Sequence, residues 1–153
     1  MAGRCGRMPS SRPRVPPQRS MPMRYVCLIH WNEQELADLA SAELNRLNAA
    51  HLDFNDEIQR SGHLIHADAL MPPRESACLR VQGGKPFITD GPFTEAKEMI
   101  AGFYVLEVRD RDEALQIAAR IPSATYATVE VRPVHTLVVE GRGEPAPELV
   151  HAS

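Results

Sequence analysis

The chain has 153 residues, of which 43% are hydrophobic, and a formal net charge of −3. This length and composition allow one domain with a substantial hydrophobic core, but not two ordinary domains. The acidic balance of residues 23–153 argues against nucleic acid as the main partner, because phosphate binding needs clustered Lys and Arg. No apolar run approaches the length of a membrane span, so we expect no membrane partner.

Both ends of the chain are expected to lie outside the folded domain. Residues 1–22 are rich in Arg and Pro and have scarcely any large apolar side chain, which predicts a disordered basic extension. The alternative is an upstream start codon in front of a true start at Met21 or Met23. Residues 137–153 are rich in Pro, Glu and Gly and are predicted to be a peripheral tail, with a possible further strand at 136–140.

The cysteines indicate the compartment. The 3 cysteines, at positions 5, 27 and 78, are odd in number and far apart, and none lies in a metal-type pair. The start of the chain also lacks the apolar centre of a secretion signal. A reduced, cytoplasmic protein is the simpler interpretation.

The folded part is predicted to begin with a strand and a long helix. Residues 23–30 (MRYVCLIH) are an apolar run typical of a strand. Asn32 suits an N-cap, and a helical pattern runs from Glu33 to about Ser61, before Gly62 as a C′ glycine. One face of this helix carries side chains three or four positions apart, namely Leu36, Ala40, Leu44, Leu47, His51, Phe54 and Ile58.

The rest of the domain has the pattern of strands around one further helix. Apolar runs separated by turn residues predict strands at 63–70, 77–82, within 83–91, at 101–108 and at 126–134. A second helix is predicted from Arg109 to Ile121, with Ala114, Ile117 and Ala118 on its apolar face.

The resulting order is β-α-β-β-β-β-α-β. Without the hairpin material in the middle, this is the split β-α-β pattern of a ferredoxin-like α+β domain. The two predicted helices can cover one face of the sheet. Residues 25–29 and 103–106 are continuously apolar, which implies burial on both faces. We therefore predict a homodimer packed sheet to sheet, with a cavity where the two faces meet.

Residues 89–98 (TDGPFTEAKE) combine a turn with several charged side chains. The Asp-Gly-Pro-Phe sequence at 90–93 suits a turn, because Asp bonds backbone N–H groups, Gly permits positive φ and Pro fixes the next φ. The residues from Thr94 onward resemble the start of a short helical turn, where acidic side chains suit the helix dipole. Lys97 is left as a candidate contact for an anionic substrate group, with a surface salt bridge as the alternative.

This stretch, followed by residues 101–108 (AGFYVLEV) and 129–134 (VEVRPV), resembles the YCII-related family, in particular its DGPF-motif branch. The resemblance covers about residues 23–136 and implies a ferredoxin-like domain that forms a dimeric α/β barrel. It leaves the activity open, since members are described as possible enzymes related in fold to muconolactone isomerases and small monooxygenases. Members with this motif often accompany extracytoplasmic-function sigma factors.

The resemblance gives His51 a candidate catalytic position. YCII proteins carry a His in the first helix, in a frame matched here by residues 50–52 (AHL) and 62–64 (GHL). They pair it with an Asp before the last strand, where residues 121–122 of this chain are Ile-Pro. Asp90 is the candidate replacement, if its turn comes over the end of the first helix. An oriented imidazole can exchange protons near neutral pH, and the alternative is a core histidine bonded to a backbone carbonyl.

Charged side chains interrupt the last strands. Glu107, Glu130 and Arg132 stand in otherwise apolar runs, and the last two share a face because they are two positions apart. Polar groups at such positions must be paired or hydrated. One interpretation is a salt bridge from Arg132 to a Glu across neighbouring strands, and the other is a polar floor of the dimer cavity that binds substrate.

A metal site is a further alternative. His66 and Asp68 share a strand face, and with a third ligand such as His30 they would form a Zn²⁺ or Fe²⁺ site. The sequence has no phosphate loop or catalytic-serine motif, so we expect neither a cofactor nor a metal.

These patterns together predict a small dimeric protein that holds a small organic molecule. Its chemistry would be cofactor-independent acid/base catalysis of the isomerase or hydrolase type, with His51 and Asp90 as acid and base. The candidate substrate contacts are Lys97, Glu107, Glu130 and Arg132. The alternative is a non-catalytic binding or regulatory module, perhaps acting with a sigma factor.

Overall fold

The structure, a computed structural model, describes residues 21–94 and 96–137. The predictions for the basic extension and for the tail fall almost wholly on residues outside these ranges. The elements are, in chain order, β1 (Met23–Asn32), α1 (Glu33–Ala37), α2 (Ser41–Arg60), β2 (Leu64–Ala69), the 3₁₀ turn η1 (Pro73–Glu75), β3 (Ala77–Gln82), β4 (Lys85–Asp90), β5 (Glu98–Val108), α3 (Arg111–Ala118), the 3₁₀ turn η2 (Pro122–Thr125) and β6 (Thr128–Pro133).

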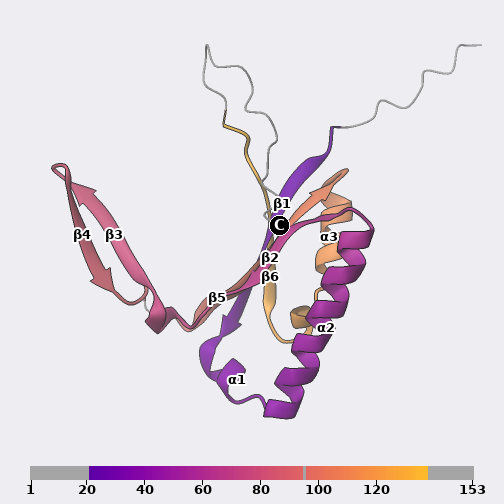
Figure 1. Cartoon of the computed structure of the whole chain (residues 1–153), viewed down its shortest axis with the longest axis horizontal. Coiled ribbons are helices and arrows are strands. Elements are labelled where there is room, and N and C mark those ends of the chain that lie inside the picture. Colours follow the sequence, from indigo (N-terminus) through magenta and orange to yellow (C-terminus); the bar gives the residue numbers. More distant parts are fainter. Residues whose placement is uncertain (1–20, 95, 138–153) are drawn as a thin grey trace, which may run out of the picture.

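Four of the strands form one antiparallel sheet in the order β2-β5-β1-β6. This order and the β-α-β-β-α-β succession around it confirm the predicted ferredoxin-like α+β fold. Figure 1 shows α2 and α3 on one side of the sheet and the β3–β4 hairpin projecting to the other side. Among the described residues, no helix is long and apolar enough to cross a membrane.

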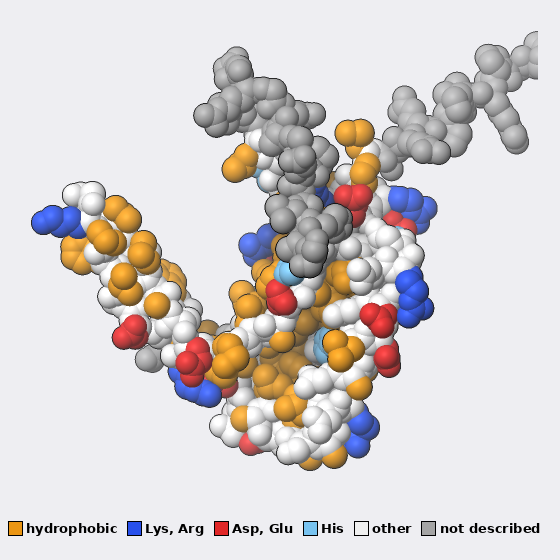
Figure 2. All heavy atoms as spheres, viewed as in Figure 1, with side chains coloured by type: hydrophobic (Ala, Val, Ile, Leu, Met, Phe, Trp, Pro, Cys, Tyr) orange, Lys and Arg blue, Asp and Glu red, His pale blue; other side chains and the backbone are white. Residues whose placement is uncertain are grey.

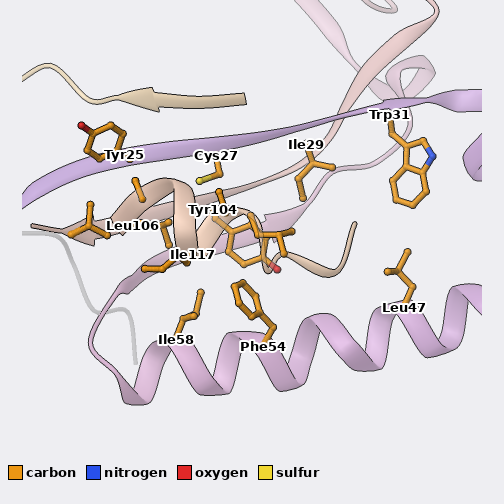
Figure 3. Close-up of a cluster of buried hydrophobic side chains, with 14 residues drawn as sticks. Tyr25, Cys27, Ile29, Trp31, Leu47, Phe54, Ile58, Tyr104, Leu106 and Ile117 are labelled. Atoms are coloured by element: carbon orange, nitrogen blue, oxygen red, sulfur yellow. The ribbon is translucent and has the colours of Figure 1, made fainter. Parts of the chain in front are cut away.

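The core lies between the sheet and the two longer helices, because alternate side chains of β1 and β5 point toward them. Figure 3 shows side chains of the sheet meeting side chains of α2. Cys27, Leu106 and Ile58 are almost completely buried there. The other buried hydrophobic side chains of this cluster are Tyr25, Ile29, Trp31, Leu47, Phe54, Tyr104, Val108, Ala114, Ile117, Ala118 and Ile121.

The predicted long helix is interrupted, so the prediction of one continuous helix from Glu33 was wrong. Asn32 caps α1 as predicted, since its side chain accepts hydrogen bonds from the backbone N–H groups of Gln34 and Glu35. Ala40 is extended, with φ −61° and ψ 142°, and α2 starts after it. The apolar spacing runs unbroken through this point, which is why the pattern conceals the break. Gly62, with φ 78°, follows the end of α2 as predicted.

β5 begins at Glu98, three residues before the predicted strand. Thr94 and Lys97 are not helical, so the expected helical turn is wrong. The physical reason is strand pairing. Glu98 and Met99 lie opposite the last two residues of β1 and extend the antiparallel ladder of the sheet.

β3 and β4 form a separate two-stranded sheet. The turn between them contains Gly83 and Gly84, both with positive φ, as a two-residue hairpin loop requires. The hairpin predicted from this sequence is therefore confirmed.

Candidate active site

A cavity of about 510 Å³ lies between α2 and the sheet. It is bounded by the C-terminal ends of β1 and β2, the first half of β5, the short helix α1 and the turn η2. Much of its wall is apolar and includes Ile29, Trp31, Leu44 and Leu47. Figure 2 shows a hollow with a mainly hydrophobic lining at this place.

His51 lies in this cavity, held between two hydroxyl groups from distant parts of the chain. Its Nδ1 atom is 2.6 Å from the Tyr104 hydroxyl on β5, and its Nε2 atom is 2.6 Å from Ser123 Oγ on η2. The two rings also stack, with centroids 6.1 Å apart. A neutral imidazole has one N–H group, so His51 donates one of these hydrogen bonds and accepts the other.

The partners of His51 are fixed by the fold. Tyr104 stands in the middle of β5 and packs edge-on against Phe54, one turn after His51 on α2. Ser123 is the second residue of η2 and only 4% exposed, because the Ile-Pro step before it turns the chain under α2. A buried hydroxyl must find a hydrogen-bond partner, and His51 supplies one to each.

Burial sets the protonation states of this group. It lowers the pKa of His51 below the ordinary value of 6.5, so the ring is neutral at neutral pH. It raises the pKa of Tyr104 to about 12, with a smaller contribution from Cys27, so the phenol keeps its proton. The site therefore holds an uncharged proton acceptor between two hydroxyl groups.

The pattern of this chain also matches a known family. Residues 23–137 match the YCII-related domain. The chain belongs to the YCII-related family. An uncharacterised protein of Rhizobium meliloti (strain 1021) is 38% identical to it over 114 residues, which cover 73% of this chain and 92% of that protein. The family predicted from the sequence is confirmed. The relative is uncharacterised, so it indicates no activity for this chain.

The YCII-related domain offers few other polar groups to a ligand. Asp68 is the one charged residue among those described that line the cavity, but its side chain alternates with the core-facing Ala67 and its carboxylate is 2.6 Å from His66 Nε2 on the other face of the sheet. Asn48 and Asn55 add amide groups to the wall. Asn55 Oδ1 is buried and has no hydrogen-bond partner among the described residues. The cavity therefore suits a neutral ligand that donates a hydrogen bond, since an unpaired buried acceptor is costly.

Asp90, the predicted partner of His51, lies elsewhere in this chain. It is the last residue of β4, is exposed and does not line the cavity. Both ring nitrogens of His51 already have partners, so within the chain Tyr104 and Ser123 occupy the place that the sequence assigned to Asp90. The physical reason is that the Asp-Gly-Pro-Phe turn closes the base of the projecting hairpin and does not come over α2.

The other predicted substrate contacts are also separated from His51. Lys97 is exposed and lies in a shallow depression beside α1. Glu107, Glu130 and Arg132 alternate with core-facing residues, so they lie on the sheet face opposite the cavity.

Glu130 on that face is paired. It accepts hydrogen bonds from Arg132 Nε at 2.9 Å and from His30 Nε2 at 2.9 Å. The hydrogen bond from Arg132, followed by that from His30, lowers the pKa of the Glu130 carboxyl group. The salt-bridge interpretation is thus favoured, although the bridge runs along one strand instead of across two.

Among the residues described, His66 and Asp68 gain no third metal ligand. His66 and Asp68 are bonded to each other, whereas His30 is engaged with Glu130. In the part of the chain that the structure describes, no group of three or more metal-ligating side chains comes together.

The protonation state of His51 predicts how stability depends on pH. The unfolded chain protonates His51 near 6.5 and the folded chain only at lower pH, so between these values the unfolded state binds more protons. The contribution of His51 to the free energy of unfolding is therefore lost as the pH falls below about 6.5. Urea unfolding at about pH 7.5 and 5.5 should show a larger loss for the wild type than for His51→Gln. Equal losses would contradict the lowered pKa.

Gly102 lies where β5 passes β2 beside the cavity. A Cβ atom at this position would be 2.8 Å from the backbone oxygen of Asp68, a contact that a backbone cannot relieve without moving. We expect Gly102→Ala to destabilise the domain by about 1–3 kcal/mol, as overpacked sites do. Urea unfolding measures this loss, and an unchanged midpoint with an unchanged slope would show that the two strands are free to separate.

Proposed function

We propose that this YCII-related protein binds a small neutral organic molecule in the cavity and moves a proton within it, without a cofactor. The observation that carries the proposal is the place of His51 on the cavity wall, with a hydroxyl group 2.6 Å from each ring nitrogen. His51 is the proton carrier. The neutral ring is the form that accepts a proton, and burial keeps it neutral.

The step fits an isomerisation. A C–H bond of the ligand breaks, and its proton passes to His51, directly or through the Tyr104 hydroxyl. His51 then returns the proton to a second position of the ligand, so the protein ends in its starting state. Ser123 keeps the other ring nitrogen hydrogen-bonded throughout, which lowers the cost of the transient positive charge.

Hydrolysis by a serine nucleophile is a weaker fit. A Ser–His pair can act in this way, but the third group usually orients the His, often as a carboxylate. Here the third group is the neutral phenol of Tyr104, and the Ser123 side chain is almost completely buried. Proton transfer therefore explains the group better than covalent catalysis does.

The protein acts as a homodimer in this proposal. The sheet face opposite the helices carries apolar side chains that are only half-buried in the single chain, among them Val26, Leu28, Phe103 and Val105. Among the described residues, no helix covers that face in Figure 1. A second copy packed sheet to sheet would remove this apolar surface from water.

One observation favours a non-catalytic binding module as the second candidate. Both partners of His51 are uncharged hydroxyl groups. Without a carboxylate nearby, the protonated imidazolium form of His51 receives little electrostatic stabilisation, so the ring is a weaker base. In this case the same cavity would bind its ligand without changing it.

The test begins with a thermal-shift screen of neutral carbonyl compounds that have acidic C–H groups and a hydroxyl or N–H group that can donate to Asn55 Oδ1. Compounds that stabilise the protein are then incubated with it in D₂O, and exchange of ligand hydrogen for deuterium is followed by ¹H NMR. We expect exchange at a specific carbon that depends on the protein. Binding without exchange would favour the binding module, and stabilisation equal in a cavity-filling Asn48→Phe variant would contradict the cavity as the site.

A further inference from the structure

The β3–β4 hairpin has one apolar face that its own chain leaves exposed. Leu79 pairs with Ile88, and Val81 pairs with Pro86, so these four side chains lie on the same face. Leu79 is 62%, Val81 60% and Ile88 64% exposed. Large apolar side chains gathered in this way on a monomer usually mark a contact surface.

The hairpin also lacks support from the rest of the described chain. Its two strands pair with each other and belong to a sheet separate from the main one. None of its residues is in the described hydrophobic core cluster. The contacts that fix it lie at its base, where the N–H group of Gly91 donates to the Ser76 carbonyl oxygen at 2.7 Å. A two-stranded sheet alone is at best marginally stable in water, so its apolar face requires a cover.

The position of the hairpin favours a cover that also reaches the main sheet. Figures 1 and 2 show it standing away from the body on the side opposite α2 and α3. This is the side of the half-buried apolar residues Leu28 and Phe103. A single partner between the hairpin and the sheet can therefore contact both surfaces.

We propose that the β3–β4 hairpin is a dimerisation arm that packs its apolar face on a second copy of this chain. The inference rests on the homodimer of the proposed function and adds to it a contact outside the sheet face. In a two-fold dimer each copy contributes an arm, so the same contact forms twice and closes the assembly.

The composition of the two surfaces supports a second copy as the partner. The four side chains of the contact face are uncharged, because Arg80 and Lys85 alternate with them and lie on the opposite face of the hairpin. The main sheet presents half-buried apolar residues such as Leu28 and Phe103 on the face away from the helices. A second copy therefore offers apolar surface of the kind that the arm requires.

The experiment is sedimentation equilibrium of the full chain, which gives the dimer dissociation constant. The variant Leu79→Ser/Ile88→Ser removes the apolar face, and we expect the dissociation constant to rise by roughly 100-fold, as for two central interface residues. The matched control is Gln82→Ser/Thr89→Ser, on the opposite face of the same hairpin, for which we expect a change below about threefold. Hydrogen exchange of β3 and β4 amides in the wild type should slow as the protein concentration rises.

The outcomes separate the arm from the sheet-to-sheet dimer. If Leu79→Ser/Ile88→Ser leaves the dissociation constant unchanged while Leu28→Asp on the main sheet makes the protein monomeric, the proposed arm contact is wrong. The sheet-to-sheet dimer is then supported. A wild type that is monomeric at about 100 μM would overturn both. Concentration-independent exchange in the hairpin, measured at concentrations below and above the wild-type dissociation constant, would overturn the arm without any variant. It therefore decides the question even if a substitution disturbs folding.

Discussion

His51→Gln is expected to lower the rate of ligand hydrogen exchange by a factor on the order of 10² to 10⁴. The amide of Gln can still hydrogen-bond to Tyr104 or Ser123, but it cannot accept a proton near neutral pH. The loss should appear in the rate constant more than in the ligand affinity, because the neutral cavity wall remains. The ¹H NMR exchange assay in D₂O measures both quantities when the ligand concentration is varied.

The matched control for this variant is His66→Gln. His66 is an exposed histidine with one close partner, Asp68, and its side chain lies on the sheet face away from the cavity. We expect its exchange rate to equal that of the wild type. Equal rates in His51→Gln and in the wild type would show that His51 does not carry the proton, even if the ligand binds in the cavity.

Leu106→Ala is expected to destabilise the folded domain by about 2–5 kcal/mol. Leu106 is completely buried near the C-terminal end of β5, facing the helices, so removal of its side chain leaves a cavity that rigid neighbours cannot fill. A domain of this size has a total stability of about 5–15 kcal/mol, so the loss is a large part of it. Urea unfolding, with the slope compared between variants, gives the free energy directly.

The control for Leu106→Ala is Leu115→Ala on α3. Leu115 is 38% exposed, whereas Leu106 is fully buried, so loss of the Leu115 side chain removes less buried area. We expect a smaller loss of about 1 kcal/mol, as for typical single substitutions. Similar losses in the two variants would contradict the position of the core between the sheet and the helices.

The sequence predicts the fold well because its local signals agree with one another. Apolar runs, the Asn32 cap and the Gly62 stop each correspond to an element boundary in the structure. One error, the missed break at Ala40, lies within an unbroken apolar spacing, and another occurs where pairing between distant residues overrides local pattern. Glu98 joins β5 only because the end of β1 lies opposite it, and nothing in the sequence between them announces this.

The candidate site is only partly predictable from the sequence. His51 is found because a polar residue interrupts an apolar helical stripe and because the family resemblance marks it. Tyr104 and Ser123 are missed, since their contact with His51 is created by packing of η2 and β5 against α2. A signal for each exists. Tyr104 places a hydroxyl in a buried strand, and Ser123 follows the Ile-Pro step where the family is expected to have its carboxylate.

The charged candidates show why residue type alone does not define a site. Glu107, Glu130 and Arg132 share strands with core residues, but the alternation of side chains places them on the face away from His51. Asp90 belongs to a hairpin whose direction follows from tertiary structure, and no periodicity in the sequence gives that direction. Sequence pattern identifies the face of an element, whereas the position of one element relative to another needs the fold.

The role of His51 as a neutral proton carrier is tested most directly by ¹⁵N NMR of its ring nitrogens, titrated with pH in the presence and absence of a bound compound. We predict a pKa below 6.5 without ligand, because the ring is buried between Tyr104 and Ser123. We also predict a change in both ring ¹⁵N shifts on binding. A ring that is protonated at neutral pH, or ¹⁵N shifts unaffected by every compound that binds, would contradict this role.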